Sequence, residues 1–163
     1  MRLTTYTDYG LRTLIYLALH PVGSSVRPTT VREIAEAYDI SRSHLVKVAQ
    51  KMVHEGYVEA ARGRSGGIRL AMSPERIVVG DVVRRMEEDL RVVECFDASG
   101  SCCLGPACTL KRALRQALDA FLQVLDGYTL ADLCAKPDVL IQLFPSAGVQ
   151  ETTGRAQPTV VPS

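Results

Sequence analysis

Residues 30–70 read TVREIAEAYDISRSHLVKVAQKMVHEGYVEAARGRSGGIRL. Thr30 and Glu33 at its start have the spacing of a capping box, in which each side chain satisfies a free backbone N–H at the start of a helix. The apolar residues that follow recur at helical spacing as far as Tyr38. The stretch therefore opens with a short, well-capped helix.

The rest of the stretch predicts a second helix and a hairpin. Ser41 is a favourable N-cap, and the helix that it begins stops at Gly56. Strand-forming residues follow at 57–60 and 68–71, separated by the basic, glycine-rich segment 62–67. Two helices joined by a tight turn and followed by a basic hairpin are the elements of a winged helix-turn-helix domain.

Helical periodicity continues on both sides of this unit. It predicts a helix over 7–20, a short helix after Gly80, a long helix over about 109–126 and a last short helix from Thr129. The fold class is therefore mainly α with a small β-hairpin wing: a winged helix-turn-helix domain plus a long dimerisation helix.

The long helix has a wide apolar seam, because its large apolar residues recur at spacings of three and four. We expect this seam to join two copies of the chain, with packing on its own domain as the alternative. The seam residues are Leu110, Leu114, Leu118, Phe121 and Leu125.

A winged domain of this kind places its second helix in the major groove of DNA. Residues at the start of that helix lie nearest the base edges, later lysines reach phosphates, and arginines of the wing tip enter the adjacent minor groove. The candidates are Ser41, Arg42, Ser43 and His44 for bases, Lys47 and Lys51 for phosphates, and Arg62 and Arg64 in the wing.

The charge distribution agrees with a DNA-binding first half. Residues 1–70 contain ten Lys and Arg against six Asp and Glu, whereas residues 71–150 contain eight against eleven. An enzyme or scaffold without a DNA role is the alternative from another class. There is no Gly-rich phosphate loop and no His-rich metal motif, so we do not expect an enzyme.

Four of the five cysteines lie within residues 95–108. They permit two spacings, Cys95-x6-Cys102-x5-Cys108 or Cys95-x7-Cys103-x4-Cys108, and neither is the paired Cys-x2-Cys of a zinc ribbon. A three-thiolate site for an iron-sulfur cluster fits these spacings better. A zinc site or a thiol-redox switch that uses the same cysteines is the alternative sensor.

The first residues lack the apolar core and cleavage site of a signal peptide, and no apolar run approaches the ~20 residues of a membrane helix. We expect a cytoplasmic protein with no membrane partner. The domains are expected to be a winged helix-turn-helix domain over 1–80, a cluster-binding loop with dimerisation helices over 81–145, and a disordered tail over 146–163.

Five segments of the chain resemble the Rrf-type winged-helix iron-sulfur regulators, the family that includes IscR and NsrR. They are residues 3–12, 41–47, 56–70, 106–111 and 128–133, and the resemblance, strongest to the nitric-oxide-sensitive NsrR branch, covers about residues 1–145. It implies a homodimeric transcriptional repressor that binds palindromic double-stranded operator DNA and releases it when nitric oxide nitrosylates or removes the cluster. An IscR-like regulator of iron-sulfur cluster supply is the alternative within the family.

The resemblance also implies which cysteines hold the cluster. By the loop spacing of the family, Cys95, Cys102 and Cys108 bind a cluster of the 4Fe-4S type, with 2Fe-2S as the alternative and Cys103 as the alternative to Cys102. Lys111 stands where IscR-like members have a histidine, which disfavours a histidine-completed 2Fe-2S site.

A fourth ligand is implied in the same way. Asp8 matches an acidic residue that reaches across the dimer in NsrR-like members, and Arg12 is one helical turn away, where it orients or neutralises the carboxylate. An ordinary ion pair within one helix is the alternative. Cys134 is expected to be a buried thiol without a role in the cluster.

Overall fold

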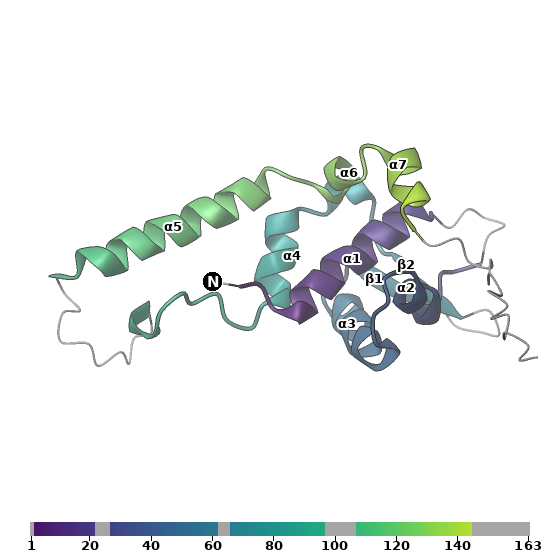
Figure 1. The fold of residues 1–163 in the computed structure, drawn as a ribbon, viewed down its shortest axis with the longest axis horizontal. Coiled ribbons are helices and arrows are strands. Elements are labelled where there is room, and N and C mark those ends of the chain that lie inside the picture. The colour runs from purple at the N-terminus through teal and green to yellow at the C-terminus, as the bar shows by residue number, and fades with distance from the viewer. Residues whose placement is uncertain (1, 22–26, 62–65, 97–106, 145–163) are drawn as a thin grey trace, which may run out of the picture.

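The structure, a computed structural model, describes residues 2–21, 27–61, 66–96 and 107–144 of the 163-residue chain, and Cys95 by its backbone alone. Its elements in chain order are α1 (Thr5–Leu19), α2 (Val31–Ala37), α3 (Arg42–His54), β1 (Val58–Ala61), β2 (Gly67–Leu70), the 3-10 turn η1 (Pro74–Arg76), α4 (Val79–Met86), the 3-10 turn η2 (Glu94–Phe96), α5 (Thr109–Asp126), α6 (Leu130–Leu133) and α7 (Pro137–Gln142). The expected class, mainly helical with a hairpin wing, is confirmed (Figure 1).

The helix-turn-helix is formed by α2 and α3, and two residues with positive φ set its bounds. Asp39, at φ 52°, turns the chain between the two helices, a conformation that Asp tolerates better than most side chains. Gly56, at φ 78°, ends α3, and the N–H of the next residue, Tyr57, donates to the carbonyl of Met52 at 3.0 Å. The chain is thereby directed into β1.

The wing is a two-stranded antiparallel hairpin in which Val58 pairs with Leu70 and Ala61 with Gly67. Its first strand begins one residue later than the sequence predicts. Tyr57 itself is buried in the core, with 6% of the residue exposed, and its carbonyl accepts the N–H of Ala71 at 3.0 Å just outside the strands. A bridge between Thr29 and the second strand ties the wing to the residues before α2.

One apolar core joins α1, α2, α3, the wing, α4 and α6. Helices α1, α3 and α4 meet at Gly10 of α1, where a Cβ atom would lie 2.9 Å from Met86 of α4 and 3.4 Å from Met52 of α3. A larger residue would force the helices apart. The most deeply buried residues of the core are Leu14, Ile34, Leu45, Val48, Met52, Val58, Ile77, Val82, Met86 and Leu130.

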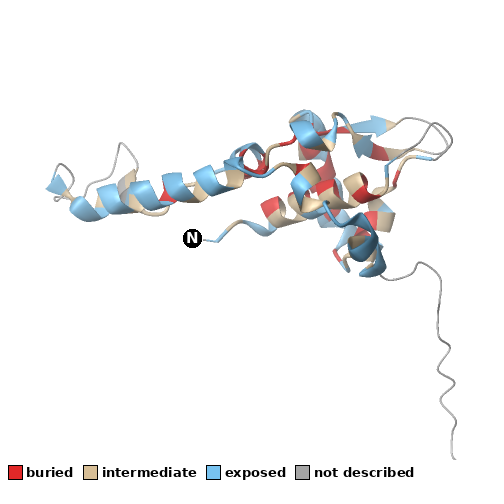
Figure 2. Ribbon diagram, turned by 90° about the horizontal axis from the view of Figure 1, so that it is seen from above, coloured by how far each residue is buried: buried red, intermediate tan, exposed pale blue. Residues whose placement is uncertain are grey.

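The long helix α5 has the predicted bounds but lies mostly outside this core. Figures 1 and 2 show it projecting from the body of the molecule with largely exposed sides. Its C-terminal end is attached by Arg84 of α4, whose two terminal nitrogens each donate to an oxygen of Asp126 at 2.6 Å. These bonds are the main cause that lowers the pKa of Asp126.

Three details differ from the sequence predictions. Gly80 lies inside α4 rather than before it, because Val79 already begins that helix. The short helix α7 was not predicted, and the aromatic rings of Tyr16 and Tyr38 each lie 5.2 Å from the ring of Phe144 that follows it. The expected disordered tail lies outside the described residues.

The three-part division of the chain stays a prediction, although α4 packs on α1 and shares its core. No helix in the described ranges combines the length and the apolar character that crossing a membrane requires.

Candidate nucleic-acid interface and cysteine segment

The second helix of the helix-turn-helix, α3, presents one apolar and one polar face. Leu45, Val48, Ala49 and Met52 are buried in the core. The predicted base-reading residues Ser41, Arg42, Ser43 and His44, and the predicted phosphate ligand Lys47, are all exposed. This exposed face begins at the N-terminal end of the helix, which is the end that reads bases in such domains.

Ser41 is the N-cap residue of α3, but its side chain makes no capping hydrogen bond. Its hydroxyl instead lies 2.9 Å from that of Ser43. Unlike Thr30 at α2, the Ser41 hydroxyl therefore leaves the first-turn N–H groups of α3 without a side-chain acceptor of its own, and such groups favour a phosphate oxygen.

Lys51 differs from the other predicted contacts. Its side chain is half-buried, and its ammonium group donates to the carbonyl of Met86 at 3.0 Å and lies 5.8 Å from the ring centre of Tyr6. Lys51 therefore connects α3 with the end of α4. Of the wing arginines, Arg62 and Arg64 lie outside the described residues, and Arg69 is exposed and pairs with Glu59 across the hairpin at 2.5 Å.

The structure brings Asp8 and Arg12 together on the exposed side of α1. The Nε atom of Arg12 lies 3.0 Å from Oδ2 of Asp8, and both side chains are about half exposed, at 45% and 47%. The guanidinium of Arg12 also lies over the ring of Tyr38, 5.7 Å from its centre. The carboxylate is thus held by one oxygen at the surface of the protomer.

The cysteine segment, residues 95–108, contacts α5 near both of its ends. Cys108 is the N-cap of α5, and its sulfur accepts the backbone N–H of Lys111 at 3.4 Å. Phe96, next to Cys95 in η2, lies under the guanidinium of Arg115 at 4.4 Å from the ring centre. Hydrogen bonds to sulfur and nearby positive charge are features of protein iron-sulfur sites.

Cys102 and Cys103 lie outside the described residues, and only the backbone of Cys95 is described. Within the described ranges no three His, Cys, Asp or Glu side chains gather as metal ligands. The donor set itself fits an iron-sulfur cluster, because clustered thiolates are the ligands that such clusters take. Cys134 is half-buried against the core, and this burial raises the pKa of its thiol.

The apolar seam of α5 divides into two edges. Successive residues turn by about 100° around a helix, so Leu110 and Val124 lie near one edge of the seam and Leu118 near the other. Leu118 is buried within the protomer, whereas Leu110 and Val124 are 65% and 62% exposed. One edge of the seam therefore packs on its own chain, and the other is uncovered.

Sequence reasoning missed a group of contacts at the start of α1. The N–H and hydroxyl of Thr4 donate to Glu87 Oε1 at 2.7 and 3.1 Å. The hydroxyl of Tyr6 donates to the carbonyl of Lys47 at 2.6 Å. The only sequence signal was an absence: Thr4 is an N-cap without an acidic residue three positions later, so no local carboxylate accepts its N–H.

Comparison with known proteins gives concordant results. Residues 3–136 match the profile of the Rrf2 family, described as iron-dependent transcriptional regulators. The chain is 49% identical to the HTH-type transcriptional regulator NsrR of Bacillus subtilis over 88% of its own length and 97% of that protein. It is 51% identical to the NsrR of Geobacillus kaustophilus over 82% of its own length and 89% of that protein.

Solved structures agree with the fold. The B. subtilis global cysteine regulator CymR superimposes with a TM-score of 0.65 at 29% identity, covering 83% of this chain and 97% of that one. The IscR of T. potens superimposes with a TM-score of 0.64, also at 29% identity, covering 83% and 87%.

Proposed function

Because the chain belongs to the Rrf2 family of iron-dependent transcriptional regulators, we propose that it is a repressor that senses nitric oxide through an iron-sulfur cluster. Members of this family are transcriptional regulators and not enzymes, and so is this chain. The repressor binds palindromic operator DNA as a homodimer and acts in the cytoplasm. The NsrR identity of its relatives supports nitric oxide as the signal.

In this proposal the polar face of α3 reads the operator. Arg42 and His44 reach base edges from the first turn, while Lys47 neutralises a phosphate. Arg62 and Arg64 at the wing tip enter the neighbouring minor groove. Two copies related by a twofold axis place two such helices on the two halves of a palindrome.

Cys95, Cys108 and either Cys102 or Cys103 hold the cluster, for which the 4Fe-4S type is our first choice and 2Fe-2S the alternative. When bound, a 4Fe-4S cluster with three cysteine ligands would supply one iron with a weaker, exchangeable ligand, where nitric oxide reacts. Asp8 of the other protomer is the candidate for that ligand. Arg12 holds Oδ2 of this carboxylate, so the second oxygen is the one offered to iron.

The observation that carries the proposal is the attachment of the cysteine segment to α5. Cys108 caps this helix and Phe96 packs on Arg115 of the same helix. The uncovered edge with Leu110 and Val124 belongs to the same helix and supports a dimer formed along it. We therefore expect a change at the cysteines to act on α5, the helix that sets the separation of the two α3 helices in the dimer.

The test compares two cysteine variants after anaerobic purification. Cys108→Ser should lose iron and acid-labile sulfide and weaken operator binding about tenfold or more, within the usual range of allosteric coupling. Cys134→Ser is the matched control and should keep iron, sulfide and operator affinity, because its thiol packs on the core. Variants Cys102→Ser and Cys103→Ser identify the middle ligand by the same assay.

Wild-type protein that contains neither iron nor sulfide yet binds the operator with full affinity would contradict the proposal. Stoichiometric zinc without iron would favour the zinc-site alternative instead.

A further inference from the structure

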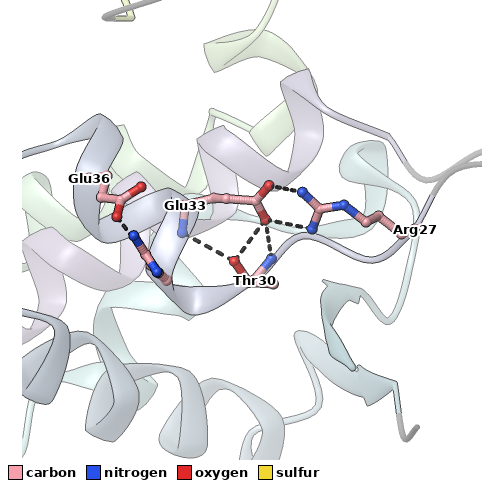
Figure 3. A network of polar contacts seen from close by, with 5 residues as sticks. Arg27, Thr30, Glu33 and Glu36 are labelled. Carbon is pink, nitrogen blue, oxygen red and sulfur yellow. Dashed lines mark hydrogen bonds and ion pairs between the residues drawn. The ribbon is translucent and has the colours of Figure 1, made fainter. Parts of the chain in front are cut away.

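Within the described part of the chain, helices α2 and α6 carry complete local capping boxes. At α2 the N–H of Thr30 donates to Glu33 at 2.7 Å, and the N–H of Glu33 donates back to the Thr30 hydroxyl at 3.2 Å (Figure 3). At α6 Thr129 and Asp132 exchange the same bonds at 2.8 and 3.3 Å. In both cases the acidic residue is three positions after the threonine, as the motif requires.

At α1 the box is completed from far along the chain. Thr4 accepts the N–H of Thr7 at 3.3 Å, but the third position is a threonine and offers no carboxylate. Glu87 takes that place: its Oε1 atom accepts the N–H of Thr4 at 2.7 Å and the Thr4 hydroxyl at 3.1 Å. The first turn of α1 therefore depends on a residue 83 positions away.

Glu87 is where the chain leaves the core for the cysteine segment. The residue before it, Met86, ends α4 and is 1% exposed. The N–H of Glu87 donates to the carbonyl of Val83 at 2.9 Å, and the residue is 8% exposed. A buried carboxylate is stable only while its hydrogen-bond donors stay in place, so its bonds to Thr4 resist displacement of this point.

The same turn of α1 holds the recognition helix. Tyr6 donates its hydroxyl to the carbonyl of Lys47 at 2.6 Å. Lys51, one turn further along α3, lies against the Tyr6 ring and donates to the carbonyl of Met86 at 3.0 Å. Helix α3 is thus bonded both to the first turn of α1 and to the residue preceding Glu87.

From these contacts we infer that Glu87, Tyr6 and Lys51 transmit the state of the cysteine segment to the recognition helix within one protomer. The inference rests on the proposed function and adds a route to it. While Glu87 caps α1, the first turn of that helix is ordered. The ordered turn keeps Tyr6 in contact with α3 and fixes the position of Asp8. Movement of the chain after Glu87 breaks the cap, frays that turn and releases α3.

The first test needs no cluster. In cluster-free protein, amide hydrogen exchange at Thr7 and Asp8 should become about fivefold faster in Glu87→Ala, the factor that corresponds to the loss of one helix cap. Glu87→Gln keeps an oxygen acceptor and should restore slow exchange. Glu88→Ala is the matched control, because Glu88 is exposed and next in the chain. Unchanged exchange in Glu87→Ala would overturn the inference.

The second test measures coupling as the ratio of operator affinities of cluster-loaded and cluster-free protein. Tyr6→Phe removes the hydroxyl alone and should lower this ratio about fivefold, the factor that corresponds to one hydrogen bond, with iron content unchanged and the protein still folded. This variant keeps the inference testable if Glu87→Ala fails to fold. A ratio equal to that of the wild type in Tyr6→Phe would overturn it.

Lys51→Met separates this role from a phosphate contact. A phosphate contact would weaken the loaded and free proteins equally and would lower the salt dependence of binding. The inferred role predicts a loss confined to the loaded protein, and an equal loss in both forms would overturn it for Lys51. If wild-type protein shows no difference between loaded and free forms, the proposed function fails, while amide exchange still decides whether Glu87 caps α1.

Discussion

Two lysines of α3, Lys47 and Lys51, have different surroundings, so we expect their substitution to have different effects. Lys47 is exposed and its side chain points to no described partner, whereas its carbonyl belongs to the contact with Tyr6. Lys51 is engaged with the end of α4. The two lysines have the same charge and lie four residues apart, yet we expect one to act on DNA and the other inside the protein.

Lys47→Ala should weaken operator binding by a similar factor for every DNA sequence, because a phosphate contact carries no sequence information. The slope of the logarithm of affinity against the logarithm of salt concentration should fall by about 1. Fluorescence anisotropy at several salt concentrations measures both quantities. Loss of binding to the operator but not to unrelated DNA would show that Lys47 reads bases.

Glu33 gives a prediction about pH. Burial alone would raise the pKa of its carboxyl, but hydrogen bonds from Thr30, together with the hydrogen bond and charge of Arg27, lower it below the ordinary value of 4.5. Because the folded-state pKa is lowered, this stabilisation is complete above pH 4.5 and is lost as the pH falls through the folded-state value. Figure 3 shows the network.

Glu33→Gln should therefore lower the free energy of unfolding by about 0.5 kcal/mol at neutral pH, the usual contribution of a carboxylate near a helix N-terminus. The difference from wild type should shrink as the pH drops below 4.5. Urea unfolding at a series of pH values measures it. A difference that stays constant into acid would contradict this interpretation.

Among the helices, α5 has an apolar seam with one edge buried within the protomer, at Leu118, and one edge exposed, at Leu110 and Val124. Leu110→Glu changes the uncovered edge and should weaken the dimer strongly while leaving the stability of the protomer nearly unchanged. Leu118→Ala changes the covered edge and should lower the free energy of unfolding by about 2 kcal/mol. Sedimentation velocity and thermal unfolding separate the two effects. A fully dimeric Leu110→Glu protein would show that the interface lies elsewhere.

Most elements could be predicted from the sequence because their signals are local. The capping box of Thr30 and Glu33 and the helical spacing of apolar residues in α5 are read from neighbouring residues, and both are present as predicted. Contacts between distant residues could not be predicted in this way. The start of α1 depends on Glu87, and the half-buried state of Lys51 depends on Met86, 35 positions along the chain.

In the candidate site too, local features could be predicted from the sequence and contacts between distant residues could not. The exposed face of α3 follows from helical spacing, and the pairing of Asp8 with Arg12 follows from their separation of four residues. That the cysteine segment is fixed to α5 through Phe96 and Arg115 depends on tertiary structure and carries no local signal.

Across the whole molecule, α1 is the helix that packs on both α3 and α4. Its first turn carries the candidate ligand Asp8 and the contact to α3, and its middle packs against α4 at Gly10. Helix α5 projects from this body and presents the uncovered apolar edge (Figure 2). In the proposed function, the candidate ligand Asp8 and the contact to α3 lie in the same turn of α1, so a change at the cluster is expected to act on the recognition helix.

In the proposed function the cluster keeps the repressor on its operator, and nitric oxide releases the repressor by destroying the cluster. This mechanism is tested most directly by titrating anaerobic, cluster-loaded protein with nitric oxide while visible absorbance and operator binding are recorded on the same sample. We predict that the operator is released in step with the loss of the cluster absorbance, and that cluster-free protein binds the operator weakly from the start. Unchanged operator affinity after complete loss of the cluster absorbance would contradict this mechanism.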